Sequence, residues 1–137
     1  SQDLGMTFTW DIFLLANETF DEGGQMFGSP DGIWIDSDDR VFVQTDGEQP
    51  GKFNDQMLVA NAKTKEIRRL FTGVAGSEVT GVTVTPDRKT MFVNLQHPGD
   101  GSPAISNFPA PYTGATGPVP RDCTIVITRK NGGIIGS

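Results

Sequence analysis

Hydrophobic and polar positions along this chain alternate in short runs of the kind that form β-strands. The runs are rich in β-branched and aromatic residues, and clusters of Gly, Pro, Asn and Asp separate them. They predict strands at about residues 7–15, 32–36, 41–45, 56–61, 66–72, 80–85, 90–96, 122–128 and 133–136. No segment has a convincing helical period, so the pattern predicts an all-β fold.

Two of the predicted strand pairs repeat each other along the chain. Gly32 aligns with Gly81, 49 positions later, and Phe42 aligns with Phe92, 50 positions later. Each copy has a glycine, an alternating apolar strand, a polar turn and a second strand. A self-similar β unit with a period of roughly 40–50 residues is typical of the blades of a β-propeller.

The repeat divides the chain into units that we expect to be blades. We predict a β-propeller segment of about two four-stranded antiparallel blades, residues 31–73 and 74–137, with residues 1–30 as a strand and loop from the preceding blade. Residues 97–121 interrupt the second unit, because they hold six of the nine prolines and are expected to form no strand. Long loops of this kind are either binding loops or inert surface excursions.

Composition excludes several classes of function. The 137 residues carry 17 acidic and 11 basic side chains, a net charge of −6, which makes nucleic acid a poor partner. No run of 18 apolar residues is present, so no transmembrane segment is expected. Cys123 is the single cysteine, which excludes an intrachain disulfide, and its apolar neighbours predict a strand residue that packs as a small hydrophobe.

Two carboxylates precede the repeated glycines and are candidate metal ligands. Propellers bind ligands around a central channel, and the residues just before the first strand of each blade enter its mouth. Asp31 precedes Gly32, and Glu78 lies shortly before Gly81. Carboxylates that converge from several blades make an oxygen-rich site suited to Ca²⁺ or Mg²⁺, or to iron if nitrogen or sulfur ligands join them. Asp31 also fits an ordinary turn, whereas no turn requires Glu78.

Two further residues stand where strands are predicted to end. His97 is the only histidine, and it either binds a metal or a phosphate or hydrogen-bonds the following loop. Asp46 occupies the equivalent position in the first copy of the repeat, where Asp46-Gly47 is most simply a turn.

Seven segments carry a resemblance to a known family, in order and over nearly the whole chain. They are residues 26–36, 43–47, 54–58, 66–73, 78–83, 90–99 and 132–136. In these segments the chain resembles the C-terminal part of the PhoX-type alkaline phosphatases. The resemblance implies a β-propeller, an exported bacterial enzyme that releases phosphate from monoesters, and a site built from iron and calcium in the full-length family. For this segment alone we expect calcium only or no metal. It carries Glu78 and Asp31 over as candidate metal ligands. Cys123 is not assigned to the family's iron-bridging cysteine, which belongs to a more N-terminal region.

From this resemblance we expect a fragment of an exported, metal-dependent phosphomonoesterase that is inactive alone. Its expected partners are a phosphate monoester in the parent protein and either the remaining propeller blades or further copies of itself. The expected location is the periplasm or outside the cell. Two alternatives stay open, a non-catalytic propeller segment that serves as scaffold or binding module, and a calcium-dependent lactonase-like hydrolase.

Overall fold

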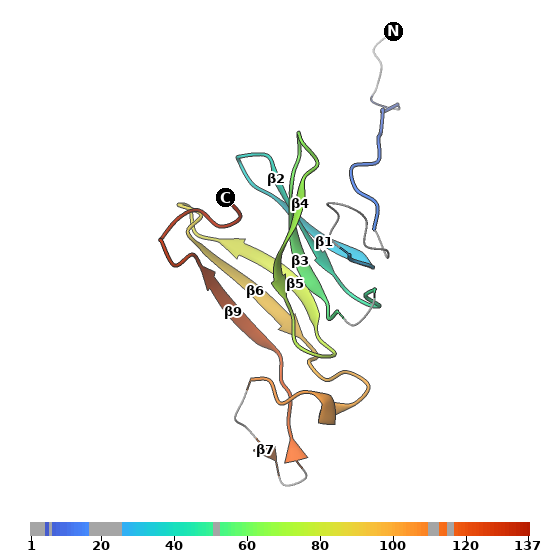
Figure 1. The fold of residues 1–137 in the computed structure, drawn as a ribbon, viewed down its shortest axis with the longest axis vertical. Coiled ribbons are helices and arrows are strands. Elements are labelled where there is room, and N and C mark those ends of the chain that lie inside the picture. The colour runs from blue at the N-terminus through green and yellow to red at the C-terminus, as the bar shows by residue number, and fades with distance from the viewer. Residues whose placement is uncertain (1–4, 6, 17–25, 51–52, 110–112, 115–116) are drawn as a thin grey trace.

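Two antiparallel β-sheets form the body of the chain in a computed structural model (Figure 1). The structure describes residues 5, 7–16, 26–50, 53–109, 113–114 and 117–137. The first sheet has the order β1 (Pro30–Ile35), β2 (Arg40–Thr45), β3 (Gln56–Asn61), β4 (Ile67–Thr72). The second has the order β5 (Glu78–Val84), β6 (Thr90–Gln96), β9 (Cys123–Thr128). The prediction of an all-β fold is confirmed, and no α-helix occurs among the described residues.

Side-chain carbonyl and carboxylate groups build the tight turns of the first sheet. Asp36 Oδ1 accepts hydrogen bonds from the backbone N–H of Asp38 (2.8 Å) and of Arg40 (3.0 Å) between β1 and β2. Asn61 Oδ1 accepts from the N–H of Lys63 (2.8 Å) and of Thr64 between β3 and β4. These contacts replace hydrogen bonds to water and fix consecutive strands as up-and-down neighbours.

The sequence repeat has a structural counterpart at its two glycines. The ladder between β1 and β2 shifts register between Pro30 and Ile33, around Gly32, and the ladder between β5 and β6 shifts between Thr80 and Val82, around Gly81. An irregularity at the same place in each copy, next to a glycine, is the behaviour of a β-bulge. Both sheets therefore begin with a bent strand.

The core lies where one face of the first sheet packs on one face of the second. Its buried members are Phe42, Met57 and Val59 from the first sheet, Val79, Met91, Val93 and Leu95 from the second, and Ile135 from the C-terminal segment. The opposite faces stay partly open, since Ile33 and Ile35 on one sheet and Val126 on the other are more than half exposed. The outer face of the first sheet is covered at its centre, where Val41, Leu58 and Ala60 are buried.

The segment expected to form the first strand, residues 7–15, forms none (Figure 1). Its apolar side chains at Phe8 (85%) and Trp10 (77%) are exposed, and Ile12 is half exposed. A strand requires a neighbour that satisfies its N–H and C=O groups along its length, and the described residues give this segment no ladder. The alternating pattern was correct for a strand, but the pairing that makes one is missing.

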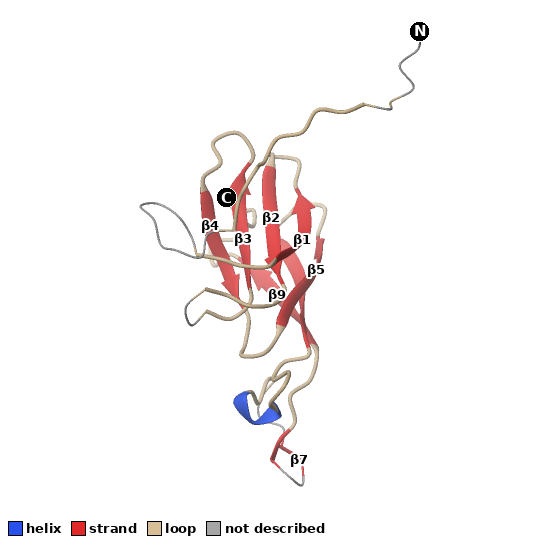
Figure 2. Ribbon diagram, turned by 90° about the vertical axis from the view of Figure 1, so that its right-hand side faces the viewer, coloured by secondary structure: helices blue, strands red, loops and turns tan. Residues whose placement is uncertain are grey.

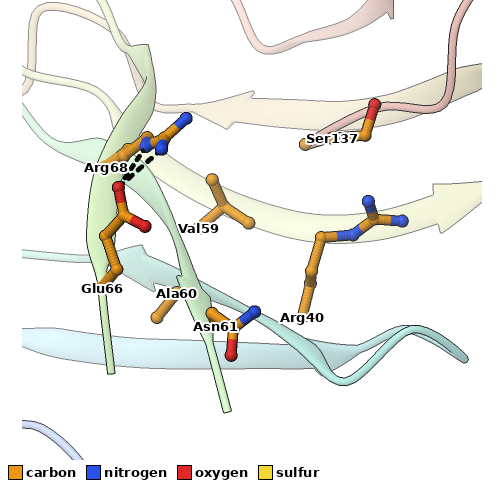
Figure 3. Close-up of a pocket in the computed structure, with 8 residues that line it drawn as sticks. Arg40, Val59, Ala60, Asn61, Glu66, Arg68 and Ser137 are labelled. Carbon is orange, nitrogen blue, oxygen red and sulfur yellow. Dashed lines mark hydrogen bonds and ion pairs between the residues drawn. The ribbon is translucent and has the colours of Figure 1, made fainter. Parts of the chain in front are cut away.

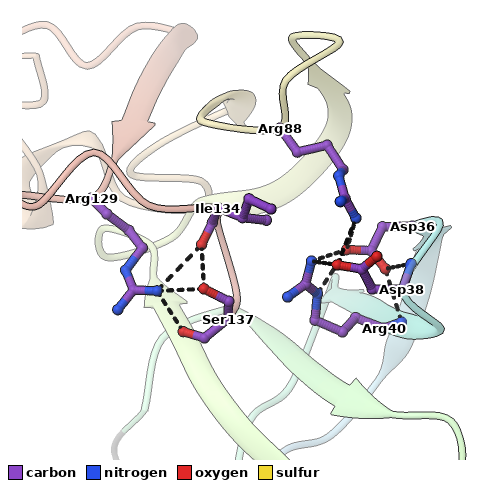
Figure 4. A network of polar contacts seen from close by, with 7 residues as sticks. All are labelled: Asp36, Asp38, Arg40, Arg88, Arg129, Ile134 and Ser137. Atoms are coloured by element: carbon purple, nitrogen blue, oxygen red, sulfur yellow. Dashed lines mark hydrogen bonds and ion pairs between the residues drawn. The ribbon is translucent and has the colours of Figure 1, made fainter.

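The prediction of a fourth strand in the second sheet, at 133–136, is also wrong. Gly132 and Gly136 have positive φ of 69° and 79°, which bends the segment, and Ile135 turns into the core with 3% of its surface exposed. Arg129 Nη1 donates to the carbonyl oxygens of Ser137 (2.7 Å) and Ile134 (3.4 Å) and holds this bend in place (Figure 4). A turn forms after β9, with the N–H of Gly132 donating to the carbonyl of Arg129 (2.9 Å), but no strand follows it.

The described parts of residues 97–121 extend beyond the strand ends at one side of the sheets (Figure 2). They contain a 3₁₀ turn, η1 (Pro103–Ile105), and two short strands, β7 (Thr113–Gly114) and β8 (Gly117–Pro118). The expectation that no strand forms here is therefore wrong in detail, because a two-residue ladder needs few backbone N–H donors. In the described part of the chain, no helix is long and apolar enough to cross a membrane.

Candidate metal site

Three side chains that could bind a metal ion meet where the strands of the two sheets end. Asp46, Glu78 and His97 each offer one ligand atom, and the three atoms lie within 4.8 Å of one another. Glu78 opens β5, His97 directly follows β6, and Asp46 directly follows β2. Antiparallel pairing places the start of β5 beside the end of β6, with Glu78 opposite Gln96. The site therefore combines both sheets.

Glu78 is the buried member of the cluster. It is 8% exposed, and it follows Ser77, which is 1% exposed and whose hydroxyl donates to the carbonyl of Val74 (2.9 Å). A buried carboxylate is costly unless positive charge or hydrogen-bond donors surround it. Its ion-pair partner among the described residues is the imidazole of His97, with Nε2 3.5 Å from Oε2. A bound cation would supply the compensating charge.

His97 is held in the orientation that a metal ligand requires. Its backbone has a positive φ of 39°, and its N–H donates to Asp122 Oδ1 (2.7 Å). Nδ1 lies 3.4 Å from the carbonyl oxygen of Gly76, which can only accept, so Nδ1 is the protonated nitrogen in this contact. In the neutral imidazole Nε2 then carries the lone pair and faces Glu78, the arrangement in which histidines bind metals.

The close approach of two loops explains how His97 reaches Glu78. Gly76 has φ of 67°, and a Cβ there would lie 2.8 Å from the backbone nitrogen of Asp100. The N–H groups of Gly99 (2.9 Å) and Asp100 (3.2 Å) donate to the carbonyls of Ala75 and Gly76. Only glycine fits this position, so it brings the loop after β6 against the loop before β5.

The charges around His97 stabilise its protonated form. Partial burial works against the charged imidazolium, but the hydrogen bond to Gly76 and the nearby carboxylates of Asp100 and Glu78 outweigh it, so the pKa of His97 rises above 6.5. A pocket that stabilises a cation at this position is electrostatically suited to a metal ion in its place.

Asp46 completes the cluster from the first sheet. Its backbone N–H donates to the carbonyl of Ser29 (3.1 Å), and its side chain is exposed. Gly47, the next residue, has φ of 131°, and a Cβ there would lie 3.0 Å from Ser29 Oγ. The turn expected at Asp46-Gly47 therefore presents the carboxylate toward the second sheet.

Asp31 does not join these three residues. It lies on β1 with an exposed side chain, beside an apolar hollow that Phe27, Ile33 and Val43 help to line. The structure thus brings Glu78 together with His97 and Asp46, while Asp31 stays on a separate part of the same end of the sheet. Its assignment as a ligand remains a prediction.

The donor set suits a metal that accepts both oxygen and nitrogen. Two carboxylates and one imidazole match iron or manganese better than calcium, which prefers oxygen ligands alone. Nitrogen was the ligand type that the sequence left open, and His97 offers it. The residues present therefore fit a metal centre, with three candidate ligands among the described residues.

A polar hollow of about 220 Å³ lies at the end of the first sheet opposite to the cluster (Figure 3). Arg40, Asn61, Glu66, Arg68 and Ser137 are among its lining residues. Arg68 pairs with Glu66 (2.5 Å), and Arg40 pairs with Asp36 (2.6 Å), so these charges are already neutralised within the chain. This hollow has no comparable set of metal ligands among the described residues.

Sequence reasoning named Glu78 and raised His97 as an alternative, but it interpreted Asp46 as a turn residue. The repeat held part of the missing signal. Asp46 and His97 follow equivalent strands, and in an antiparallel pair the residues after the second strand lie beside the start of the first. This rule places His97 beside Glu78 and Asp46 beside the start of β1, and the packing of the two sheets then brings Asp46 to Glu78.

Comparison with known proteins identifies relatives of the chain. The family described as alkaline phosphatase PhoX matches residues 1–99. Among solved structures, Pseudomonas fluorescens PhoX in complex with vanadate, a transition state analogue, matches with 44% identity and a TM-score of 0.68. The match covers 81% of this chain and 19% of that one, so the chain spans about a fifth of that relative. A search of the curated proteins found no match.

Proposed function

The chain belongs to the PhoX alkaline phosphatase family, and from this membership we propose that it supplies part of a metal-dependent active site that hydrolyses phosphate monoesters. The convergence of Asp46, Glu78 and His97 carries the proposal. All three lie in or beside segments in which the chain resembles the family. Because the chain spans 19% of its solved relative, the remaining ligands and the substrate contacts come from other parts of the protein. We propose that these 137 residues are inactive alone.

In this proposal Glu78, His97 and Asp46 are ligands of one metal ion. The buried Glu78 carboxylate contributes a charge that little water screens, and the Gly76 carbonyl orients the His97 ring. We assign iron to this cluster because of its nitrogen ligand, and calcium to oxygen ligands elsewhere in the protein. Asp31 remains a candidate for such an oxygen site. A bound metal supplies charge stabilisation for the phosphoryl oxygens and activates the attacking oxygen.

We propose further that the chain is part of a β-propeller in an exported protein. The up-and-down order of both sheets and the repeated bulge support this assignment. The half-exposed apolar residues Ile33, Ile35 and Val126 are then covered by neighbouring blades or, in the isolated chain, by further copies.

Metal binding by the chain itself tests the proposal. The wild type and Glu78→Gln are titrated with Mn²⁺ in a calorimeter. Mn²⁺ is a redox-stable probe that accepts oxygen and nitrogen ligands. We expect one binding event that weakens at least about 10-fold in the variant, because a buried charged ligand is lost. Glu66→Gln is the matched control, since Glu66 is exposed and lies outside the cluster.

The proposal fails if the wild type does not bind Mn²⁺, or if Glu78→Gln and Glu66→Gln bind it equally well. Hydrolysis of p-nitrophenyl phosphate adds a second criterion. The 137-residue chain is expected to show none, while the full-length protein hydrolyses the ester and loses this activity with Glu78→Gln.

A further inference from the structure

We propose that Asp55 is a positioning residue that fixes the Asp46 carboxylate in the metal cluster by binding the residues on both sides of it. This inference rests on the proposed function, because it concerns the same site. Asp55 itself lies outside the cluster of ligand atoms and directly precedes β3. It would act through the backbone that carries Asp46.

The hydrogen bonds of Asp55 bracket Asp46. Its Oδ1 accepts from the hydroxyl of Thr45 (2.6 Å), and its Oδ2 accepts from the backbone N–H of Gly47 (3.3 Å). The two oxygens of one carboxylate thus hold the residue before Asp46 and the residue after it. The N–H of Asp46 donates to the carbonyl of Ser29, so three consecutive residues are each fixed by a contact outside their own turn.

Asp55 is itself held by contacts to the segments that flank the strands of the first sheet. Its carbonyl oxygen accepts from the N–H of Gly73 (2.7 Å), beyond the end of β4. The Gln49 amide donates to Asp55 Oδ1 (3.0 Å), and the same side chain also exchanges two hydrogen bonds with the backbone of Gly28. Gln56, the next residue, is fully buried, and its N–H donates to Thr45 Oγ1 (2.9 Å). A carboxylate held from so many sides can hold a neighbouring turn in one conformation.

Keeping the Asp55 carboxylate ionised in the folded chain is unfavourable. Burial raises its pKa, the nearby charge of Asp46 raises it further, and the bonds from Thr45, Gly47 and Gln49 only partly offset this. A neutral amide would avoid this cost, but it could not accept from both flanking residues with both of its terminal atoms. The demand for two acceptors explains an aspartate here.

Outer contacts that orient metal ligands typically change metal affinity by about 10–100-fold. We therefore expect Asp55→Asn to weaken Mn²⁺ binding by at least about 10-fold in calorimetric titration of the chain. Asp36→Asn is the matched control, because Asp36 is also a hydrogen-bonded carboxylate of the first sheet but lies in the turn at its opposite end. That variant should lower the melting temperature without changing Mn²⁺ affinity, which separates positioning from general stability.

A second variant keeps the test decisive if Asp55→Asn does not fold. Thr45→Val removes the 2.6 Å contact from the other side. It should weaken Mn²⁺ binding too, because it releases the residue before Asp46, whereas Asp55→Asn releases the N–H of Gly47 after it. Full affinity in a folded Asp55→Asn or Thr45→Val variant overturns the inference.

The two proposals fail in different ways. If Asp46→Asn and Glu78→Gln leave Mn²⁺ binding unchanged, the metal site itself is wrong. If both weaken binding while Asp55→Asn and Asp36→Asn do not, the metal site stands and only the role of Asp55 is refuted.

Discussion

Gly81 lies against the side chain of Asn94 so closely that a Cβ at Gly81 would be 2.8 Å from Asn94 Nδ2. The first copy of the repeat has the same arrangement, with a Cβ at Gly32 falling 2.6 Å from Gln44 Oε1. The equivalence explains why the glycines recur while the residues around them differ. Each bulge needs room for an amide side chain from the neighbouring strand.

The two glycines should respond differently to substitution. Gly81 has a φ of 59°, whereas Gly32 is not among the residues with positive φ. Gly32→Ala therefore creates a steric clash and no backbone strain. It should lower the free energy of unfolding clearly less in a Gln44→Ala background than in the wild type. Gly81→Ala should still cost about 1–2 kcal/mol with Asn94→Ala, because removing the amide does not relieve the backbone. Urea unfolding of the four variants and their double mutants measures this, and equal relief in both pairs would contradict it.

A network of charges joins the turns of the two sheets (Figure 4). Asp36, whose side chain is 1% exposed, pairs with Arg40 (2.6 Å), and Arg88 from the second sheet pairs with Asp38 (2.9 Å) and approaches Asp36 (3.6 Å). Removing the Asp36 charge with Asp36→Asn should lower the free energy of unfolding by about 3 kcal/mol, since the arginines lose their buried partner. Asp39→Asn, which breaks only an exposed pair with Lys63, should change it by less than about 1 kcal/mol.

Asp36 also predicts how stability depends on pH. Burial works against its charge, but the hydrogen bonds and charge of Arg40 outweigh burial, so the pKa of Asp36 lies below 3.8. A lowered pKa stabilises the folded chain above pH 3.8, and this stabilisation is lost as the pH falls through the folded-state value. Urea unfolding across pH 2–6 should therefore show a steeper acid decline for the wild type than for Asp36→Asn, and identical slopes would exclude the effect.

Ile135 carries the C-terminal bend into the core between the sheets. It is 3% exposed, and its N–H donates to the carbonyl of Arg88 (3.0 Å). Ile135→Ala should cost about 2–4 kcal/mol in thermal or urea unfolding, as large-to-small changes in packed cores do. Ile105→Ala is the control, because Ile105 is 54% exposed and should be nearly neutral. A small effect at Ile135 would mean that the C-terminal bend is not part of the core.

Local patterns predicted the strands that have partners. The apolar run in 56–61 and the alternation in 90–96 matched β3 and β6 to the residue, since both are central strands, β3 buried at five of six positions and β6 at alternate ones. Similar patterns failed at 7–15 and 133–136. Pairing depends on what lies beside a strand, which its own sequence does not contain, and Gly132 and Gly136 bend the second segment away.

The candidate site also combines a residue that the sequence predicts with residues that depend on tertiary packing. Glu78 was predictable because no turn required a carboxylate before an apolar strand. Asp46 was not, because its partners come from a different sheet and its own Gly47 offered a simpler explanation. The contact between the Gly76 and Gly99 loops, which delivers His97, depends on tertiary packing that sequence spacing alone does not reveal.

The central claim is that Asp46, Glu78 and His97 bind one metal ion. Crystals of the chain soaked in Mn²⁺ and measured above the manganese absorption edge test it most directly. We expect an anomalous difference peak within bonding distance of a carboxylate oxygen of Asp46, one of Glu78, and Nε2 of His97. A map with no peak among these three atoms, or with its strongest peak at Asp31, would contradict it.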